Sequence, residues 1–237
     1  VGGIIAAIVI DVAASLAFGN FGFVILALFF VGSMATDKFK KRSAKSRQSF
    51  KSDNKGHRNI IQVFANGAVA AVSAAIFILT KQTIFAVSFV ASMAESLADT
   101  AASGIGSSSQ SVYDIVRLKR CAPGVSGGVS ISGTLAALVA SLILPLVAIP
   151  FGILNITGSL VASAAAFLGM IVDSVLGSLL QAKYQCLRCG TVLEQTNHCG
   201  EKCLKISGVA VVDNNLVNFI SNFTSALFGA GAFMLFM

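Results

Sequence analysis

The chain has 237 residues, of which 55% are hydrophobic and 11% are charged, and its formal net charge is +7. Soluble domains carry about a quarter charged residues, so the composition excludes a soluble domain, a disordered chain, a coiled coil, collagen and a disulfide-stapled secreted scaffold. Twenty-two glycines and only three prolines suit helices that pack closely in lipid. The composition predicts an all-α fold, a polytopic bundle of membrane-spanning helices.

Seven apolar stretches are candidate spans, because about 20 apolar residues cross a hydrocarbon core of about 30 Å. They cover residues 2–18, 20–36, 60–80, 82–106, 129–149, 151–181 and 211–236, in one membrane domain over residues 1–237. The first two are joined only by Gly19 and Asn20, which favours a tight helical hairpin. The first stretch lacks a basic leader and a small-residue cleavage site, so it does not resemble a signal peptide. The apolar runs do not alternate, which excludes a transmembrane β-barrel.

Positive charge is concentrated in the connections after the second, fourth and sixth stretches. Of 17 Lys and Arg residues, nine lie in residues 38–58, three in 117–120 and four in 183–205. A seven-span chain places these connections on one side, which the positive-inside rule makes cytoplasmic. The prediction is that both termini lie outside and that three loops are cytoplasmic. These are a basic loop at 37–58, a Gly-rich loop at 107–128 and a Cys-rich loop at 183–208.

The basic loop at 37–58 holds nine basic and two acidic side chains, which equals the whole net charge of +7. One interpretation is an orientation signal that lies on anionic lipid headgroups. Another is attraction of an anionic substrate. Nucleic acid is not expected as a partner, because only Phe39 and Phe50 interleave the basic residues.

Acidic side chains inside or at the edge of membrane spans usually face a cavity or a partner. Here they are Asp11, Glu95, Asp99, Asp173 and Asp213. All but Asp11 are expected toward the cytoplasmic leaflet, where mutual repulsion would be costly unless the acids share a cation. Oxygen ligands without His suit Mg²⁺. Asp99, Asp173, Asp213 and Glu95 are therefore the candidate magnesium ligands, whereas Asp11 is equally explained by a helix-packing hydrogen bond or protonation.

Helical spacing places several polar side chains on common faces. Glu95, Asp99 and Ser103 are four residues apart in turn, and Asn215, Asn218 and Asn222 share a second face. Asn and Ser also form ordinary interhelical hydrogen bonds in lipid, and that alternative stays open for each of them.

The segment CAPGVSGGVSISGT at 121–134 is rich in glycine and follows Arg117, Lys119 and Arg120. Glycines allow backbone N–H groups to form an anion-binding nest, to which the cations add charge. The candidate phosphate-contacting glycines are Gly124, Gly127 and Gly128. The alternative is a turn that simply re-enters a helix, and the chain has no Walker A sequence.

Four cysteines lie in the Cys-rich loop, and His198 is adjacent to the third of them. They are Cys186, Cys189, Cys199 and Cys203. Thiols in the cytosol stay reduced, so disulfides are not expected. The paired spacing suggests a Cys₄ structural zinc knuckle, while catalytic zinc is disfavoured because no carboxylate and His set accompanies it.

Four sequence blocks resemble a known family. They are GHRNIIQVFANG (56–67), ASMAESLADTAASGIGS (91–107), PGVSGGVSISGT (123–134), and a last block from VDSVLGSLLQAKYQCLRCG (172–190) through HCG (198–200) to DNNLVNFIS (213–221). Their order and spacing resemble the multi-span membrane family that contains the chloroplast phytyl-phosphate kinases and their archaeal and animal relatives. The resemblance covers most of the chain from residue 56 onward.

The ADTAASGIG segment is also similar to the nucleotide motif of dolichol kinases and of the phosphatidate cytidylyltransferase group. The matching positions are Asp99, Ala102 and Gly106. This similarity implies CTP as phosphoryl donor, Mg²⁺ as cofactor and an isoprenoid phosphate as acceptor. Two positions depart from the phytyl-phosphate kinase pattern: Gly104 stands where Glu is usual, and Val125 where Thr is usual. Glu95 is a candidate replacement for that carboxylate; otherwise the chain is inactive or altered in substrate.

The resulting hypothesis is an integral membrane kinase that makes an isoprenoid diphosphate at the cytoplasmic face, which in a prokaryote is the face of the cell membrane. The expected catalytic residues are Asp99, Asp173, Lys119, Arg120 and Asn218. The expected nucleotide contacts are Ser103, Gly106, Gly124, Gly127, Gly128, Asn214 and Asn215. Three alternatives stay open: a cation or small-solute transporter with intramembrane acids, a CTP:lipid-phosphate cytidylyltransferase, and a non-catalytic scaffold.

Overall fold

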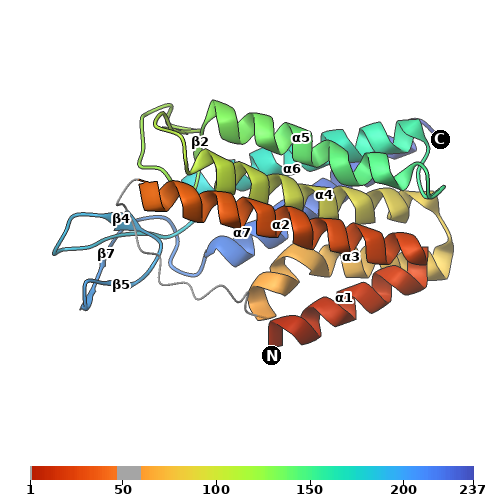
Figure 1. The fold of residues 1–237 in the computed structure, drawn as a ribbon, viewed down its shortest axis with the longest axis horizontal. Coiled ribbons are helices and arrows are strands. Elements are labelled where there is room, and N and C mark those ends of the chain that lie inside the picture. The colour runs from red at the N-terminus through yellow and green to blue at the C-terminus, as the bar shows by residue number, and fades with distance from the viewer. Residues whose placement is uncertain (1, 47–59) are drawn as a thin grey trace.

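The computed structural model describes residues 2–46 and 60–237, and it is mostly helical, as predicted (Figure 1). The helices of this part are α1 (Gly2–Phe18), α2 (Asn20–Ser46), α3 (Ile60–Thr80), α4 (Thr83–Gly106), α5 (Ile131–Ala148), α6 (Ile156–Leu179) and α7 (Asn214–Met234). Within it, six helices are long and apolar enough to cross a membrane. The exception is α1, with 17 residues. Its crossing stays a prediction, as does the orientation of the bundle.

Local capping explains where three of the helices begin. The Ser130 side chain accepts a hydrogen bond from Gly133 N at the start of α5, and Asn155 accepts one from Gly158 N at the start of α6. Asp213 caps α7 in the same way. Such side chains satisfy backbone N–H groups that have no partner inside the helix.

The second helix is longer than predicted. It was expected to end at residue 36, but α2 continues to Ser46, so residues 37–46 of the predicted basic loop are helical. The reason is that this stretch contains Lys, Arg and Ala, which favour helix, and neither Gly nor Pro. The rest of that loop, residues 47–58, lies outside the described residues.

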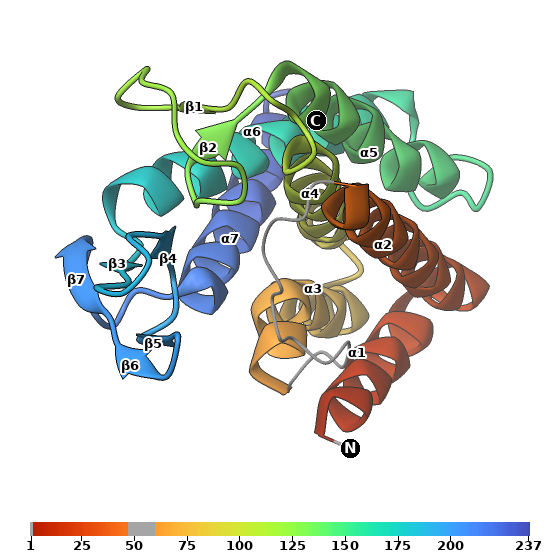
Figure 2. The same cartoon turned by 60° about the vertical axis from the view of Figure 1, so that its left-hand side comes forward.

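Helix α4 is the centre of the bundle (Figure 2). Of the residues in the most apolar stretch of α4, 83% are buried inside the protein. In the other five candidate spans the corresponding share is 33–44%. It packs against α2, α3, α5, α6 and α7. Many buried side chains of α4 are Ala or Ser, which permits close approach of its neighbours.

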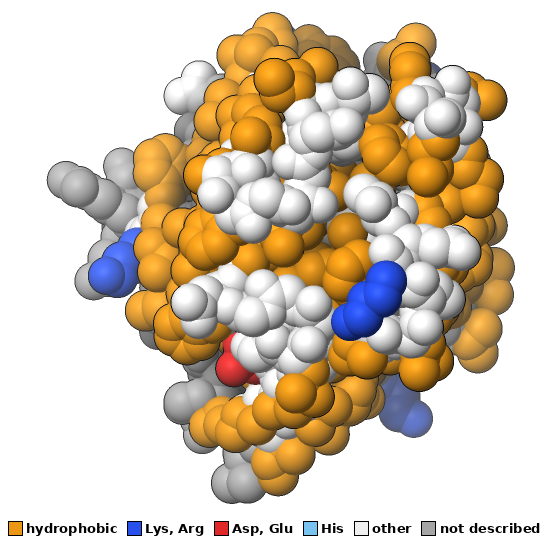
Figure 3. Space-filling model, turned by 90° about the vertical axis from the view of Figure 1, so that its right-hand side faces the viewer, with side chains coloured by type: hydrophobic (Ala, Val, Ile, Leu, Met, Phe, Trp, Pro, Cys, Tyr) orange, Lys and Arg blue, Asp and Glu red, His pale blue; other side chains and the backbone are white. Residues whose placement is uncertain are grey.

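Charged residues are concentrated at one end of the bundle. The connections that follow α4 and α6 lie at the same end as the C-terminal part of α2 (Figure 1). Figure 3 shows the opposite end, which is covered by hydrophobic and uncharged polar side chains with few charged ones. Among the described residues of the turns at that end, Lys81 is the single charged one. This segregation supports one common side for the three predicted cytoplasmic loops. The predicted position of the N-terminus is wrong, because α1 and α2 run in opposite directions and the start of α1 therefore lies toward the charged end (Figure 1). Seven crossings place the two termini on opposite sides.

Both described loops contain short antiparallel strands that sequence analysis did not predict. They are β1 (Tyr113–Asp114), β2 (Gly128–Val129), β3 (Lys183–Gln185), β4 (Val192–Leu193), β5 (Asn197–His198), β6 (Glu201–Lys202) and β7 (Leu204–Ser207). Strand β1 pairs with β2, β3 lies between β4 and β7, and β5 pairs with β6. Strands of two to four residues are too short to produce an alternating sequence pattern.

Candidate functional site

Three carboxylates from two helices lie near one another between the middle of the bundle and its charged end. Glu95 and Asp99 lie one turn apart on α4, and Asp173 lies on α6. Glu95 is 1% exposed and Asp173 is 8% exposed, whereas Asp99 is half-buried. The charges of Asp99 and Asp173 act on Glu95, and that of Asp99 acts on Asp173. The structure therefore brings together three of the four predicted magnesium ligands.

Glu95 is the most constrained of the three acids. Neither Oε1 nor Oε2 accepts a hydrogen bond of ordinary geometry among the residues that the structure describes, although the Ser221 hydroxyl, which donates to Asp173, also acts on the Glu95 carboxylate. Gly169 of α6 lies against it, because a Cβ at that position would be 2.7 Å from Glu95 Cγ. An unpartnered buried carboxylate costs several kcal/mol unless it is protonated or meets a cation. The arrangement therefore suits a bound cation.

Helix α7 supplies polar partners for Asp173. The Ser221 hydroxyl donates to Asp173 Oδ2 at 3.1 Å. With the Asn218 amide nitrogen turned toward the same oxygen, the distance is also 3.1 Å. The Asn218 side chain lies 3.3 Å from that of Asn66 on α3, so α3, α6 and α7 meet at this point. Asn218 was predicted as a site residue.

A second polar contact ties α4 to its neighbours. Ser96 Oγ lies 2.9 Å from the backbone oxygen of Asn66 and 2.9 Å from Asn222 Oδ1. The Asn222 amide in turn donates to the backbone oxygen of Asn218 at 2.8 Å. Sequence reasoning missed Ser96 and Ser221 as site residues, because single serines in spans usually serve packing. The available signal was that Ser221 follows Asn218 by three residues.

The start of α7 places the remaining predicted residues of this region at the surface. Asp213 is exposed, and its Oδ1 accepts from Leu216 N at 2.9 Å. Its Oδ2 accepts from the Asn215 side chain at 2.8 Å. Asn214 is exposed, and its backbone oxygen lies 2.9 Å from the Asn218 amide nitrogen turned as above. Helix capping accounts for Asp213, and its role as a metal ligand stays a prediction.

The Gly-rich loop rests on the end of α6, one turn beyond Asp173. Gly127 has φ +81°, and a Cβ there would lie 2.5 Å from Ser178 Cα. A Cβ at Gly177 would lie 3.1 Å from Gly127 N, so the two backbones touch. Gly124 also has a positive φ, +86°, but no atom lies within 4 Å of its Cβ position. Gly128 lies in β2.

Asp114 anchors this loop, although sequence reasoning missed it. Its carboxylate accepts from Arg117 N at 2.8 Å and from the Ser178 hydroxyl at 2.7 Å. Burial alone would raise the pKa of Asp114, but these hydrogen bonds, one from Val116 N and the charge of Lys183 hold it below its ordinary value. The anchor is therefore present at neutral pH, above the unfolded pKa, and is lost only as pH falls below about 4 through the folded pKa.

Lys183 is a buried cation at the start of β3, just beyond the end of α6. Its Nζ lies 3.5 Å from the backbone oxygen of Ser178. Burial lowers the pKa of Lys183, and the charge of Asp114 opposes that effect. Both residues therefore contact Ser178 at the end of α6, Asp114 through the hydroxyl and Lys183 through the backbone oxygen.

The predicted basic residues of the Gly-rich loop and the predicted residues at the end of α4 make different contacts. Lys119 and Arg117 are exposed, and Arg120 Nε donates to the Tyr113 hydroxyl at 3.2 Å. Ser103 is exposed and donates to Thr100 O. A Cβ at Gly106 would lie 3.4 Å from Gly133 Cα, and one at Gly104 would lie 3.0 Å from Thr36 Cβ. Close helix packing therefore accounts for both glycines, and a nucleotide contact for Gly106 stays a prediction.

Glu194, which follows β4 in the Cys-rich loop, links that loop to the Gly-rich loop. Its Oε1 accepts from Ser126 N at 3.1 Å, and the Ser126 hydroxyl donates to the same oxygen. The charge of Glu194 also acts on Asp173. Sequence reasoning missed Glu194, because it lies outside the spans and no local pattern marks it.

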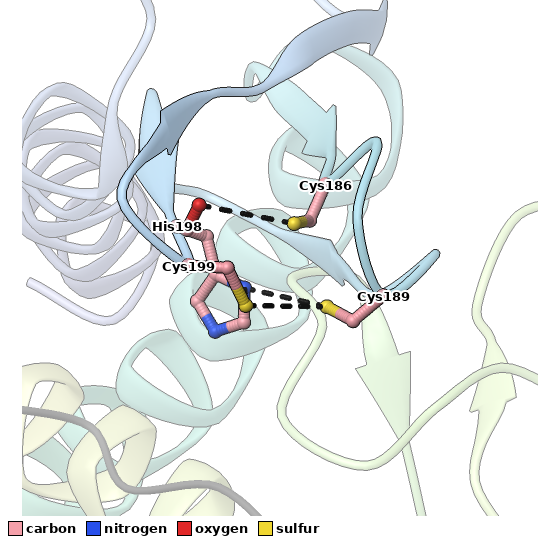
Figure 4. Close-up of side chains that lie close together, drawn as sticks. All are labelled: Cys186, Cys189, His198 and Cys199. Carbon is pink, nitrogen blue, oxygen red and sulfur yellow. Dashed lines mark hydrogen bonds between the residues drawn. The ribbon is translucent and has the colours of Figure 1, made fainter.

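Cys186, Cys189, His198 and Cys199 form a cluster that could hold a metal (Figure 4). Their ligand atoms all lie within 4.8 Å of one another. The structure thus places His198 in the group, where the Cys₄ prediction had Cys203. Desolvation and the neighbouring thiols raise the pKa of Cys199 to about 11.

Replacing Gly127 by Ala should detach the Gly-rich loop from α6. The new Cβ meets backbone atoms of Ser178 and also forces an L side chain into positive φ, a strain of about 1–2 kcal/mol by itself. Trypsin cleavage within residues 117–120 is expected to become at least several-fold faster. The matched control is Gly124→Ala, which carries the strain without the contact. Equal cleavage rates for the two variants would contradict the docking.

The fold defines a multi-pass integral membrane protein, and its site is a buried polar cluster toward the charged end of the bundle. The chain belongs to the family described as integral membrane protein DUF92, whose model matches residues 1–226. The predicted family and the multi-pass membrane location are thereby confirmed.

Three relatives share much of the chain. An uncharacterized membrane protein of Synechocystis, sll0875, is 32% identical over 163 residues, which cover 68% of this chain and 63% of the relative. Protein VTE6, chloroplastic, of Arabidopsis thaliana is 29% identical over 187 residues, covering 76% and 56%. Protein PGR of Arabidopsis thaliana is 26% identical over 228 residues, covering 85% and 77%. The chain thus spans less than two thirds of the first two relatives. No solved structure matches it.

Proposed function

We propose that this protein transfers the γ-phosphoryl group of CTP to an isoprenoid monophosphate, giving the lipid diphosphate and CDP. The observation that carries the proposal is the convergence of Glu95, Asp99 and Asp173, with the Glu95 carboxylate fully buried and without a hydrogen bond of ordinary geometry among the described residues. Phosphoryl transfer requires mainly positioning and charge stabilisation, and a cluster of acids that accommodates a divalent cation provides a starting point for both.

The donor set fits Mg²⁺. Glu95, Asp99 and Asp173 offer hard carboxylate oxygens without sulfur or imidazole, which is the chemistry that magnesium prefers. When bound, Mg²⁺ would neutralise charge on the donor phosphates. Ser221 donates a hydrogen bond to the Asp173 carboxylate at 3.1 Å, and the Asn218 amide, turned so that its nitrogen faces the same oxygen, would donate a second at 3.1 Å.

The Gly-rich loop at the charged end of the bundle would bind the rest of the nucleotide. Gly127 and Gly128 lie where the Gly-rich loop meets α6. Ser126 N donates to Glu194 and Gly128 N donates to Val125 O, so a phosphate bound by this loop would replace these acceptors. The exposed side chains of Lys119 and Arg117 at the edge of the same loop would attract the triphosphate. Arg120 is held against Tyr113 and would contribute charge from there.

The acceptor needs no strong general base. A lipid monophosphate already carries a nucleophilic oxygen, which forms the new P–O bond while the bond between the β-bridging oxygen and the γ-phosphorus breaks. CDP leaves with the electron pair of that bond. The site therefore has to bring two anionic groups together, and a candidate His base is not required.

A groove lined mainly by apolar side chains, together with Asp11, Ser33 and Asp37, supports an amphiphilic lipid acceptor. It has a volume of about 470 Å³, and α1, α2 and Val63 of α3 line it. A smaller adjoining pocket shares Val63 and Phe30 with the groove and reaches Asn66. The Asn66 side chain lies 3.3 Å from that of Asn218, so an isoprenoid tail in the groove would point its phosphate toward the acids. The resemblance to the phytyl-phosphate kinases favours the same class of acceptor.

Product analysis tests the proposal. Purified protein in detergent is incubated with phytyl or geranylgeranyl monophosphate, Mg²⁺ and labelled CTP. Lipid diphosphate with CDP is the expected result. Pyrophosphate with a CDP-lipid would assign the protein to the cytidylyltransferases instead. No CTP consumption with several lipids would contradict the kinase and favour the transporter or an inactive relative in which Gly104 is decisive.

A further inference from the structure

The Cys-rich loop has little core of its own. Between the end of β3 and the start of β7, Cys186 is the single buried residue of this described segment. Leu204 and Ile206 of β7 are exposed by 57% and 45%. Segments that bury so little apolar surface usually depend on a covalent or metal cross-link to keep one structure. The Cys-rich loop is therefore expected to contain such a cross-link.

We propose that Cys186, Cys189, His198 and Cys199 bind one structural Zn²⁺, which fixes the loop so that Glu194 reaches Ser126 of the Gly-rich loop. The proposal is independent of the proposed kinase activity. It assigns His198 as the fourth ligand in place of Cys203.

The distances between ligand atoms fit a tetrahedral zinc site. With Zn–S about 2.3 Å and Zn–N about 2.0–2.1 Å, tetrahedral geometry requires S···S of about 3.8 Å and S···N of about 3.5 Å. Cys189 Sγ and Cys199 Sγ are 3.9 Å apart. His198 Nδ1 lies 3.4 Å from the former and 3.3 Å from the latter. Figure 4 shows the His198 ring and the Cys199 sulfur beside each other, both facing the sulfur of Cys189, with Cys186 above them in the view.

The backbone presents the ligands from two tight turns. In the first, Gly190 N donates to Cys186 O at 2.8 Å, and Gly190 has φ +71°. The second turn joins β5 to β6, and its central residues are Cys199, with φ +53°, and Gly200, with φ +81°. A two-residue hairpin turn of this kind normally has Asn, Asp or Gly at its first position. Cys in that strained position indicates that its thiol has a function.

The cluster is connected to the carboxylate site through one strand. Thr191 follows the first turn and its backbone oxygen accepts from Cys186 N at 2.9 Å, after which β4 leads directly to Glu194. Glu194 then accepts from Ser126 N at 3.1 Å. One metal ion that binds both turns therefore also fixes the position of Glu194, whose side chain binds Ser126 of the Gly-rich loop.

Zinc content tests the assignment. Elemental analysis of purified wild-type protein should give about one Zn²⁺ per chain. Cys189→Ser and His198→Ala should each reduce it at least tenfold, whereas Cys203→Ser and Cys121→Ser should retain it. Absence of zinc from protein made in zinc-supplemented medium, or loss in Cys203→Ser with retention in His198→Ala, would overturn the ligand set. Cobalt-substituted wild-type protein provides a test that needs no variant, because its visible spectrum distinguishes S₃N from S₄ coordination.

Hydrogen exchange tests the link to Glu194. Removing zinc with a chelator should speed amide exchange in residues 183–207 and also in residues 123–128. Glu194→Ala, which removes the accepting oxygen while zinc is retained, should speed exchange in 123–128 alone. Faster exchange in 183–207 without any change in 123–128 would overturn the linking role. None of these measurements depends on turnover, so failure of the kinase proposal is seen separately.

Discussion

Replacing Asp173 by Asn should reduce phosphoryl transfer by about 10²-fold or more while leaving a folded protein. The amide can still accept the hydrogen bond that the Ser221 hydroxyl donates at 3.1 Å, so α6 and α7 keep their contact. What the variant loses is the negative charge that faces Asp99 and Glu95. The rate is measured with saturating CTP and lipid monophosphate across a range of Mg²⁺ concentrations.

Two controls separate this effect from misfolding. Ser163→Ala removes another buried polar side chain of α6, one that donates to Ser159 O at 2.8 Å, and it should keep most of the wild-type rate. Size-exclusion profiles of both variants should match the wild type. A rate for Asp173→Asn within twofold of the wild type would remove Asp173 from the site.

Replacing Glu95 by Gln should uncouple the stability of the protein from Mg²⁺. In the wild type, Mg²⁺ at 100 times its dissociation constant would stabilise the fold by about 2.7 kcal/mol, which corresponds to about 5–10 °C in Tm. The variant should lose more than half of that response, because Glu95 is the buried carboxylate whose oxygens accept no hydrogen bond of ordinary geometry in the described chain. Without Mg²⁺ it should be at least as stable as the wild type, since a buried acid has been removed. Thermal unfolding in detergent with and without Mg²⁺ measures both quantities.

The matched control is Ser88→Ala, two turns earlier on α4. Its hydroxyl lies 3.2 Å from Ala226 O, so the change removes a contact between α4 and α7 that lies nearer the uncharged end of the bundle. This variant should lose a little stability and keep the full Mg²⁺ response. The same Mg²⁺ response in Glu95→Gln as in the wild type would show that the cation binds elsewhere.

The spans were predictable because lipid imposes a long, continuous apolar pattern on each helix. Helical spacing also predicted that Glu95 and Asp99 share a face. The predicted topology placed Asp99, Asp173 and Asp213 at one depth. The structure brings the first two near Glu95, whereas Asp213 is exposed at the start of α7. Sequence could not predict that Asp213 would be a helix cap, because an Asp before α7 fits either role.

The contacts between loops were the part that sequence could not provide. Asp114, Lys183 and Glu194 act through partners that lie far away in the chain, such as Ser178 and Ser126. Each is an ordinary surface residue by type, and only the tertiary structure buries it or gives it a partner. His198 in place of Cys203 has the same origin, because a two-residue hairpin brings His198 and Cys199 to the first turn.

The most direct test of the central claim is the fate of a γ-phosphate label from CTP. Wild-type protein, Asp173→Asn and Ser163→Ala are incubated side by side with geranylgeranyl monophosphate and Mg²⁺, and the lipid fraction is counted. Label in the lipid diphosphate with the wild type and Ser163→Ala, but not with Asp173→Asn, is the predicted result. Label that stays in CTP or leaves as pyrophosphate in the wild type would contradict a kinase built on these carboxylates.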